Sequence, residues 1–274
     1  MTPAQKCICA HSSGRFIPLK THGKEVLDKN QQRIHNPENE HVYFLERLME
    51  QSRPVGSTQK AEQTRQRILD SALRLFATKG YEKTTLRDIA AEAGSSLGLT
   101  YRYFAHKEEL VLSLYRRLAQ DLETQVGELT PAPLADRFQR TMLTQFKLMA
   151  PYRDTLSAIF DAALNPRSEV GVFSESSADV RQLSKKLFIE VVTGATDAPR
   201  GSQVGNIATI LYGLYLGLVL FWLQDRSPGT KTTFELLSFT RDMLALVRPL
   251  LVVPPVASAL ARLARILGPM LGDA

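Results

Sequence analysis

Cysteine and histidine are scarce in this chain of 274 residues. It has two cysteines, Cys7 and Cys9, and five histidines, none of which follows His106. Two cysteines are too few for a disulfide framework and suit a reducing cytosol. Cys7, Cys9 and His11 invite a metal interpretation, but a structural zinc site normally needs four ligands at fixed spacings. We therefore expect no metal, no cofactor and a cytoplasmic location.

Several sequence patterns of enzymes and exported proteins are also missing. The chain contains no GxGxxG, Walker A, HExxH or GxSxG pattern. Because its C-terminal half has no histidine, acid–base or nucleophilic roles would fall to scattered carboxylates. The N-terminus lacks the apolar segment of a secretion signal. We expect a protein that is not an enzyme and is not secreted.

The positive charge of the chain is unevenly distributed. The net charge is +6, and residues 58–120 carry 11 Lys and Arg against 7 Asp and Glu, whereas residues 121–274 carry 15 of each. A hydrophobic share of 44% and a charged share of 23% are ordinary for a soluble globular protein. The local excess of positive charge is what a phosphate-facing surface requires.

Residues 85–104, TLRDIAAEAGSSLGLTYRYF, predict two short helices joined by a tight turn. Apolar residues recur at helical spacing until Gly94 breaks the pattern. Thr85 with Asp88 three residues later forms a capping-box start, and Ser95 and Ser96 can cap the second helix. The second helix then carries hydrogen-bonding, cationic and aromatic side chains. A helix–turn–helix of this kind is suited to a DNA major groove.

Residues 68–110, ILDSALRLFATKGYEKTTLRDIAAEAGSSLGLTYRYFAHKEEL, resemble the DNA-binding domain of the tetracycline-repressor (TetR) family of transcriptional regulators. The Lys-Gly-Tyr turn at 79–81, the Thr-Thr cap, the YRYF ending and the Lys-Glu pair at 107–108 follow the order and spacing of that family. The resemblance implies an all-α fold. Its parts would be an N-terminal three-helix helix–turn–helix domain and a C-terminal helical ligand-binding and dimerisation domain.

The second short helix and its flanks supply the expected DNA contacts. Tyr101 and Thr100 can reach base edges or a thymine methyl group, and Arg102 can pair with guanine or a phosphate. Leu97 stands where the family often has lysine, so either Arg102 or His106 would supply the missing charge. Tyr103 is expected at the core edge or at a phosphate. The complete predicted set is Thr85, Arg87, Ser95, Ser96, Leu97, Gly98, Leu99, Thr100, Tyr101, Arg102, Tyr103, His106 and Lys107.

Helical periodicity and proline punctuation predict helices in the rest of the chain. Leucines recur every fourth residue from Leu110 to Leu122, which predicts a long connecting helix. The predicted helices are 59–79, 107–129, 134–150, 152–164, 177–194, 203–224, 231–251 and 256–271. Val256, Leu260, Leu263, Leu267 and Met270 form the predicted inward stripe of the last one. The predicted domains are a DNA-binding domain at 58–110, a regulatory and dimerisation domain at 111–254, and a C-terminal helix at 255–274.

Residues 1–57 form a polar N-terminal extension that we expect to be disordered. A short helix at 42–50 and a linker at 53–57 interrupt it. Met49 precedes a polar segment and the first strong helix, which suggests the hypothesis that translation starts there. A peptide from residues 1–48 in protein from the native host would exclude that start.

Residues 207–223, IATILYGLYLGLVLFWL, carry no charge. This segment is just short of the length expected to span a bilayer, and Gly213 and Gly217 form a GxxxG pattern known from membrane dimers. The other interpretation is a helix in a soluble dimer interface. We favour the interface because the next helix offers a matching apolar face. The alternative is a membrane-associated helical scaffold with a vestigial DNA-binding motif.

The resemblance implies a homodimer that binds a palindromic operator on double-stranded DNA and is released by a small apolar or amphipathic effector. A repressor is the simplest form; an activator and a non-specific architectural binder remain alternatives. Large side chains on the regulatory helices either line the effector pocket or belong to the core. The predicted pocket residues are Met142, Phe146, Met149, Phe160, Phe188, Tyr212 and Tyr215, with Trp222 as a further candidate.

Overall fold

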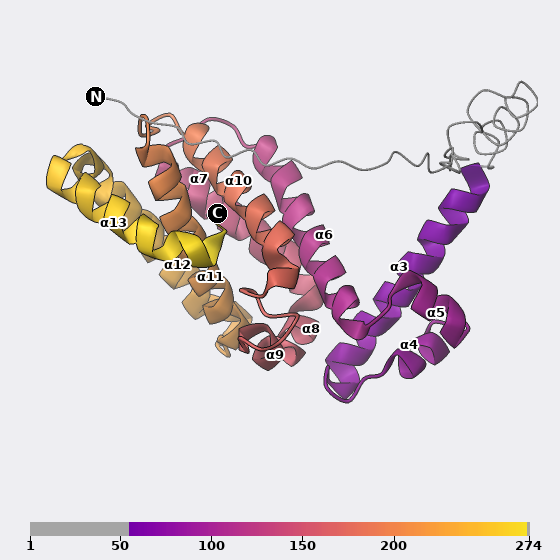
Figure 1. Cartoon of the computed structure of the whole chain (residues 1–274). Coiled ribbons are helices and arrows are strands. Elements are labelled where there is room, and N and C mark those ends of the chain that lie inside the picture. The colour runs from indigo at the N-terminus through magenta and orange to yellow at the C-terminus, as the bar shows by residue number, and fades with distance from the viewer. Residues whose placement is uncertain (1–54, 273–274) are drawn as a thin grey trace, which may run out of the picture. The chain divides into compact units, whose positions relative to one another are not determined.

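The structure, a computed structural model, describes residues 55–272, with the side chains of residues 55–57 and 252 left out. Within residues 55–272 there are helices, 3-10 turns and one isolated bridge between Ala132 and Ala195, but no strand (Figure 1). The predicted all-α fold is confirmed. The N-terminal extension, its Cys7-x-Cys9-x-His11 group and the hypothetical start at Met49 lie outside the described residues.

Three helices pack around Phe76: α3 (Val55–Lys79), α4 (Leu86–Glu92) and α5 (Leu97–Tyr103). Helix α3 begins four residues before the predicted start, so residues 55–57, predicted as part of a linker, are helical. Phe76 is fully buried and meets the ring of Tyr81 edge-on at a centroid distance of 5.2 Å. Such an edge-to-face pair adds to the stabilisation from burial.

Helix α6 (Lys107–Gly127) leaves this group and packs against α7 (Leu134–Met149) and α10 (Ala178–Thr193). Its leucine stripe from Leu110 to Leu122 is buried, as the spacing predicts. Its buried residues belong to one continuous core, which also contains Phe76 and the buried side chains of the following helices, and Figure 1 shows α6 running between the two groups of helices. One rigid element therefore connects the two groups of helices.

The remaining elements largely follow the predicted bounds. Predicted helix 152–164 is instead a 3-10 turn and two short helices, because Ile159 leaves helical geometry with φ −98° and ψ 1°. The predicted helix 231–251 ends at Val247, and a 3-10 turn that contains Pro249 forms the rest of the predicted range. The observed helices are α7 (Leu134–Met149), α8 (Arg153–Ala158), α9 (Phe160–Leu164), α10 (Ala178–Thr193), α11 (Gln203–Gln224), α12 (Lys231–Val247) and α13 (Pro254–Leu271).

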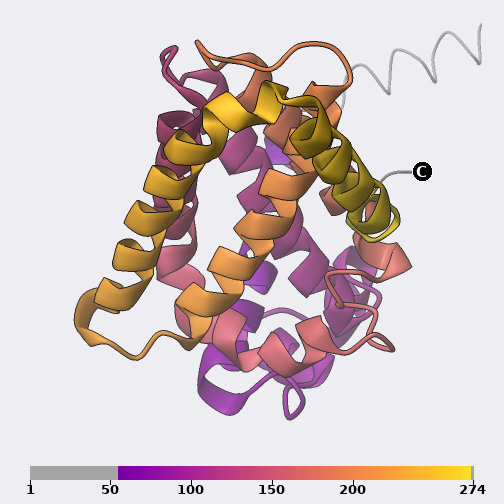
Figure 2. The ribbon, with the colours of Figure 1, turned by 90° about the vertical axis from the view of Figure 1, so that its left-hand side faces the viewer.

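Helix α11 packs against α10 and α13, whereas α12 packs mainly against α7. Figure 2 shows α11 flanked by α12 on one side and α13 on the other. The predicted inward stripe of α13 is partly wrong, because Leu263 and Met270 are 41% and 56% exposed. Ala264 and Gly268 are buried instead. Leu267 and Leu271 of α13 lie closest to Gly213 of α11, where an added Cβ would meet their side chains at 3.8 Å and 3.6 Å.

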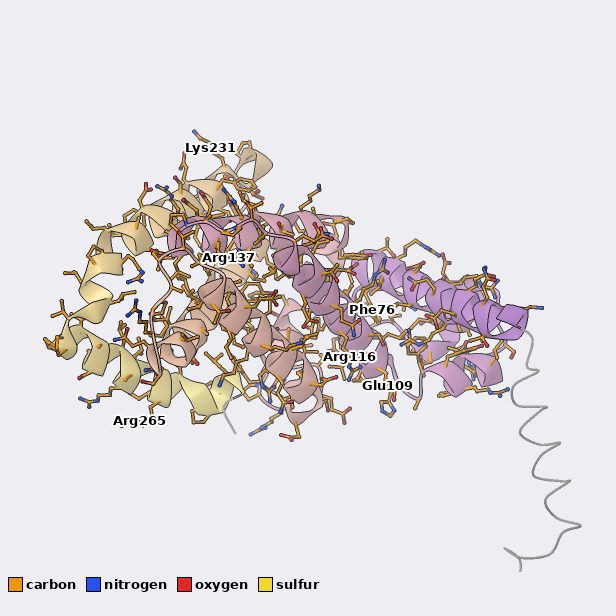
Figure 3. All side chains as sticks on the ribbon, turned by 90° about the horizontal axis from the view of Figure 1, so that it is seen from above. Phe76, Glu109, Arg116, Arg137, Lys231 and Arg265 are labelled. Carbon is orange, nitrogen blue, oxygen red and sulfur yellow. The ribbon has the colours of Figure 1, made fainter. Side chains whose placement is uncertain are left out.

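Arg137 of α7 is a buried cation that connects three segments. It is 3% exposed and donates to the carbonyl oxygens of Leu129 at 3.0 Å, Thr130 at 3.3 Å and Val191 at 3.0 Å. Figure 3 shows it among the helices that follow α6. Val191 lies near the C-terminal, negative end of α10, which favours a cation there. A methyl group added to Gly194 would meet this guanidinium at 2.6 Å.

Candidate nucleic-acid interface and apolar cavity

The start of α4 is fixed by a capping box. The Thr85 side chain accepts from the backbone N of Asp88 at 3.2 Å, and Asp88 Oδ2 accepts from the backbone N of Thr85 at 2.9 Å. The Lys79 ammonium also contacts Asp88 Oδ2 at 2.7 Å. These bonds, that of Lys79 first, lower the pKa of Asp88 to about 2. The predicted capping box is confirmed, and it ties the end of α3 to the start of α4.

One of the two serines before α5 caps it. Ser96 Oγ accepts from the backbone N of Leu99 at 3.2 Å, as predicted. Ser95 Oγ lies 2.8 Å from Thr100 Oγ1, so the expectation that Ser95 caps the helix is wrong. Gly94 has φ +58°, a left-handed conformation that glycine adopts without the penalty of a Cβ atom. This turn sets the direction in which α5 leaves α4.

Thr100 points into the protein. It is 0% exposed, and its hydroxyl bonds with Ser95 Oγ and with the carbonyl of Ser96 at 3.2 Å. A buried hydroxyl with these partners cannot reach a base edge. The prediction of Thr100 as a DNA contact is therefore wrong, because its position faces α4 rather than solvent. The hydrogen bond between the half-buried Ser95 and the buried Thr100 links the turn to α5.

The outward face of α5 carries Tyr101, which is 53% exposed, together with Gly98 and Arg102. Figure 1 shows α5 beside α4. Tyr103 is half-buried against the core and Phe104 is buried, so Tyr103 lies at the core edge. Among the other predicted contacts, Thr85, Arg87 and Ser96 are exposed, and Leu97 and Leu99 are half-buried. Exposure permits these contacts, which stay predictions.

Lys83 is an exposed cation near the start of α4 that the sequence reasoning missed. The signal was present, since Lys83 directly precedes the Thr84-Thr85 pair that starts the helix. A cation at this point adds to the positive charge of Arg87 and Arg102. Phosphate contacts depend mainly on such charges.

Lys107, predicted as a phosphate contact, is largely engaged within the protein. Its ammonium donates to the carbonyl oxygen of Tyr81 at 3.1 Å, lies 4.1 Å from the centre of the Tyr81 ring and 3.8 Å from Glu82. The Tyr81 hydroxyl donates to Glu108 at 3.0 Å, and burial together with this carboxylate raises the pKa of the phenol. Lys107 therefore fixes the entry to α6.

His106 gives α6 no side-chain cap, as its weak capping tendency predicts. Glu109 compensates, because its Oε2 accepts from the backbone N of Ala105 at 2.8 Å. His106 itself is exposed and lies 3.7 Å from Glu109. Its predicted DNA contact stays a prediction.

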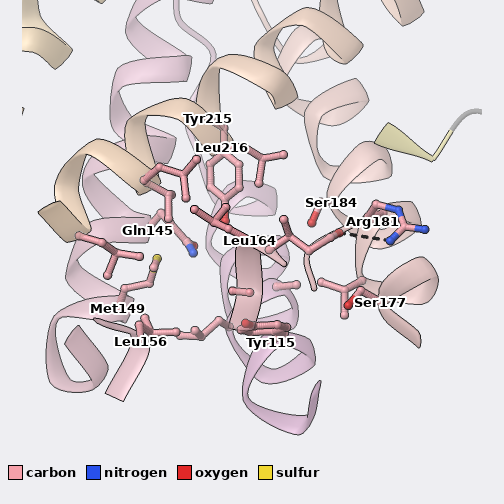
Figure 4. A pocket seen from close by; sticks show the side chains of 18 of the residues that line it. Tyr115, Gln145, Met149, Leu156, Leu164, Ser177, Arg181, Ser184, Tyr215 and Leu216 are labelled. Carbon is pink, nitrogen blue, oxygen red and sulfur yellow. Dashed lines mark hydrogen bonds between the residues drawn. The ribbon is translucent and has the colours of Figure 1, made fainter. Parts of the chain in front are cut away.

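A mostly apolar cavity of about 140 Å³ lies among α6, α7, α8, α9, α10 and α11 (Figure 4). Three of the predicted pocket residues, Met149, Phe160 and Tyr215, line it. Helix α6 contributes Tyr115 and Leu118, which the sequence reasoning missed. Their signal was weak, because Leu118 reads as an ordinary member of the leucine stripe and Tyr115 lies next to that stripe.

The other predicted pocket residues belong to the core. Met142 is fully buried away from the cavity lining. Phe146 stacks on Trp222 at a centroid distance of 5.6 Å, and Phe188 stacks on Tyr212 at 5.7 Å. The prediction of Met142, Phe146, Phe188 and Tyr212 as ligand contacts is wrong for this cavity, because each is used in side-chain packing; the further candidate Trp222 is too.

The cavity wall also contains polar groups that the sequence reasoning missed. Gln145 is 2% exposed, and its Oε1 has no hydrogen-bond partner among residues 55–272. Its signal was readable, since it lies seven residues after Phe138 on the apolar face of α7. Ser177, Ser184 and Arg181 complete the polar part of the wall.

Two contacts connect the cavity wall to the helix–turn–helix group. Leu156 of α8 lines the cavity, and the hydroxyl of the preceding Thr155 donates to the carbonyl oxygen of Leu73 in α3 at 3.0 Å. The second connection is α6 itself, which lines the cavity with Tyr115 and begins at Lys107 beside Tyr81. The lining helices α6 and α8 are thus both in contact with the helix–turn–helix group.

Helix α11 is long and apolar enough to cross a membrane, and a bent pair that includes α13 passes the same test of length and composition. The inner face of α11 is packed within the protein, since Ile207, Ala208 and Leu211 are buried. Helices α10 and α13 cover it. The apolar composition of α11 is thus accounted for by the core and by the exposed face described below.

Within residues 55–272 the protein is helical, with a capped helix–turn–helix at the start of a long helix and an apolar cavity lined by the middle of that helix, which is the architecture of a ligand-controlled DNA-binding regulator. The sequence profile described as "Bacterial regulatory proteins, tetR family" matches residues 68–114. The profile "Tetracyclin repressor-like, C-terminal domain" matches residues 137–244. The chain belongs to the TetR family, whose members are DNA-binding transcription regulators and not enzymes.

Individual relatives agree with this assignment. The HTH-type transcriptional repressor KstR of Rhodococcus jostii is 27% identical over 179 residues, which cover 64% of this chain and 79% of KstR. A TetR-family regulator from Syntrophomonas wolfei has a TM-score of 0.55 and 22% identity, covering 68% of this chain and 96% of that one. The regulator FadR from Bacillus subtilis in complex with stearoyl-CoA has a TM-score of 0.51 and 18% identity, covering 64% and 96%. The two structures show a shared fold.

Proposed function

We propose that this chain is a cytoplasmic, ligand-responsive repressor that binds a palindromic operator as a homodimer. The observation that carries the proposal is the sharing of α6: its first turn anchors the helix–turn–helix group, and its middle lines the cavity. A molecule in the cavity therefore contacts the same element that holds α5. The name of the relative KstR, a transcriptional repressor, supports repression, and the stearoyl-CoA complex of FadR supports regulation by a ligand.

The proposed dimer interface is an apolar face on α11 and α12. Phe239 and Leu246 are 60% and 66% exposed, and Phe221 is exposed on α11. An added Cβ at Gly217 would meet no atom within 4 Å, so this side of α11 is open to a close approach. Exposed apolar patches of this kind mark interaction sites. The other exposed members are Phe234, Met243, Val247 and Leu250.

A dimer also fits the size of the reading helix. Helix α5 has seven residues, and a single module of this size buries too little surface for tight specific binding. Two-fold symmetry places two α5 helices in successive major grooves, with half-sites one helical turn or a multiple apart. Tyr101 and Arg102 are the proposed base contacts. We place Thr85, Arg87 and Ser96 at phosphates. Gly98 and Leu97 would lie where α5 comes closest to the DNA.

Release follows if the effector prefers a position of α6 that moves the two reading helices out of register. A differential affinity of ~3 kcal/mol between the two states changes DNA affinity about 100-fold. A preference of this size is within the usual range of allosteric coupling. Induction therefore needs no covalent chemistry.

Footprinting on genomic fragments selected by the purified chain tests the proposal, with mass measured in solution in the absence of detergent. We expect a discrete palindromic footprint and a dimeric mass. Diffuse protection would indicate an architectural binder, and insolubility without detergent would favour the membrane-associated alternative. A monomer with no preference for any duplex over random competitor would refute the proposal.

A further inference from the structure

The cavity contains a buried hydrogen-bond acceptor without a protein partner. Gln145 reaches the cavity from α7, and its Oε1 bonds with none of the residues that the structure describes. Most of the neighbouring wall is apolar, including Met149, Leu156 and Leu216. Leaving such an acceptor buried and unpaired is costly, and a ligand that donates a hydrogen bond removes this cost.

A donor lies on the same side of the cavity. Figure 4 shows Tyr215 of α11 and Gln145 of α7 on one side, with Tyr215 pointing into the cavity. Burial, and to a smaller extent Tyr212, raises the pKa of the Tyr215 phenol, so its hydroxyl keeps its proton at neutral pH. A hydroxyl group on a ligand both donates and accepts, and it therefore matches this pair.

The wall offers little to an anion. Arg181 is the one charged side chain among the lining residues, and its Nη1 already donates to the carbonyls of Val172 at 3.2 Å and Ser174 at 2.5 Å. Figure 4 shows its guanidinium directed away from Gln145. Its Nε has no partner within the described part of the chain, which leaves an anion at this wall as the competing interpretation. A buried carboxylate without full pairing is strongly disfavoured.

We infer that the cavity takes a neutral apolar molecule with one hydroxyl group, an alcohol or a phenol, whose hydroxyl lies between Gln145 and Tyr215. The inference rests on the proposed function, since it names the chemical class of the effector for the same cavity. Apolar cavities of ~150 Å³ hold a benzene-sized molecule, so about 140 Å³ suits a ring or a short chain. The alkyl chain of a longer ligand would extend out of the cavity beside Leu164 and Phe173, which are the exposed residues of the lining.

Displacement of Nile red from the full-length chain measures the preference directly. The probes are straight-chain alcohols from hexanol to dodecanol, their methyl ethers, the carboxylic acids of the same length, and simple alkylphenols. At neutral pH we expect the best alcohol or phenol to bind on the order of tenfold more tightly than its ether and its acid. Tighter binding of the acid would overturn the inference in favour of an anion at Arg181. Failure of every probe to displace the dye would overturn it as well.

Two substitutions locate the hydroxyl. Gln145→Leu removes the acceptor at similar volume, and we expect the alcohol-to-ether affinity ratio to fall close to one while the ether keeps its affinity. Tyr215→Phe lowers the ratio to a smaller extent. Gln139→Leu, on the same helix but outside the lining, is the matched control and keeps the wild-type ratio. A wild-type ratio in Gln145→Leu would contradict the assignment.

Thermal unfolding verifies that each variant folds; if Gln145→Leu does not, Tyr215→Phe and the probe series on the wild type still decide. Operator binding without any probe is measured separately. A chain that shows the alcohol preference but binds no operator would refute the proposed function and leave this inference intact. A chain that binds an operator but prefers the acid would do the reverse.

Discussion

The helices of the helix–turn–helix and the helices around the cavity begin in different ways. Helix α4 is capped by Thr85 and Asp88, and α5 by Ser96, all within three residues of the groups they satisfy. Helix α7 has no cap from its own N-cap residue, and Asp197 accepts from the backbone N of Leu134 at 2.7 Å instead. The helix–turn–helix is thus capped by neighbouring residues, whereas the start of α7 depends on Asp197, which lies 63 residues further along the chain.

This difference has a functional meaning. A reading helix must hold one geometry against DNA, and local capping fixes it without help from the rest of the molecule. A cavity that responds to a ligand needs walls that can move relative to one another. Long-range contacts such as that of Arg241 in α12 with Asp136 in α7 at 2.8 Å hold the helices around the cavity in place from outside its lining.

The largest expected effect is the loss of stability when Arg137 is removed. Arg137→Ala removes the donor to the buried carbonyl oxygen of Val191 and to the part-buried one of Leu129, and we expect the free energy of unfolding to fall by about 3 kcal/mol. Chemical denaturation measures this loss. Arg140→Ala, an exposed arginine on the same helix, should change stability by less than ~1 kcal/mol. Equal effects of the two substitutions would show that the buried cation has no special role.

Truncating Tyr101 should affect DNA affinity and leave the fold intact. We expect Tyr101→Ala to weaken specific operator binding by roughly 1–3 kcal/mol, because the exposed ring is the main candidate for base contact. Gel-shift titration measures the affinity, with random duplex as the control. An unchanged affinity would remove Tyr101 from the reading surface.

Acid should weaken the local link between α3 and α4. The pKa of Asp88 is lowered to about 2 in the folded chain, against ~3.9 for an unperturbed aspartate. Its contribution is therefore fully present above pH ~4 and is lost as the pH falls toward 2. Comparison of wild type with Asp88→Asn by denaturation across this window measures it. Parallel pH profiles for the two proteins would contradict the assignment.

The smallest expected effect concerns Lys107. Each phosphate contact changes the salt slope of DNA binding by ~0.9, so Arg87→Ala should lower the slope by about that amount. Lys107→Ala should lower it by less, because this ammonium is engaged with Tyr81 and Glu82. Titration of operator affinity against salt distinguishes them. A larger change in Lys107→Ala than in Arg87→Ala would return Lys107 to the phosphate contacts.

The same contrast explains what could be predicted from the sequence. The capping box at Thr85, the leucine stripe of α6 and the bounds of α11 follow from local chemistry and periodicity, and the structure confirms them. The inward direction of Thr100 could not be predicted from residue type, because a threonine suits both a base contact and a buried turn. The break at Ile159 has no strong local signal either.

The cavity lining was the least predictable part. Size and apolarity selected Phe146 and Phe188, but whether a large side chain borders a void or fills it depends on which partner reaches it. Gln145 was more informative than any aromatic residue, since a polar residue on an apolar helix face needs a partner. The cavity is the space that the side chains of several helices leave unfilled, so its volume cannot be predicted from any single segment.

The hydrogen bond from Thr155 to the carbonyl of Leu73 lies one residue from Leu156 in the cavity lining. Selection for a new effector at this wall therefore acts on a residue whose neighbour holds the backbone of α3. If the chain is regulated through this cavity, substitutions at this wall should change effector and operator affinity together. Divergence of effector preference should instead accumulate on α9 and the segment before α10, where the lining has no such attachment.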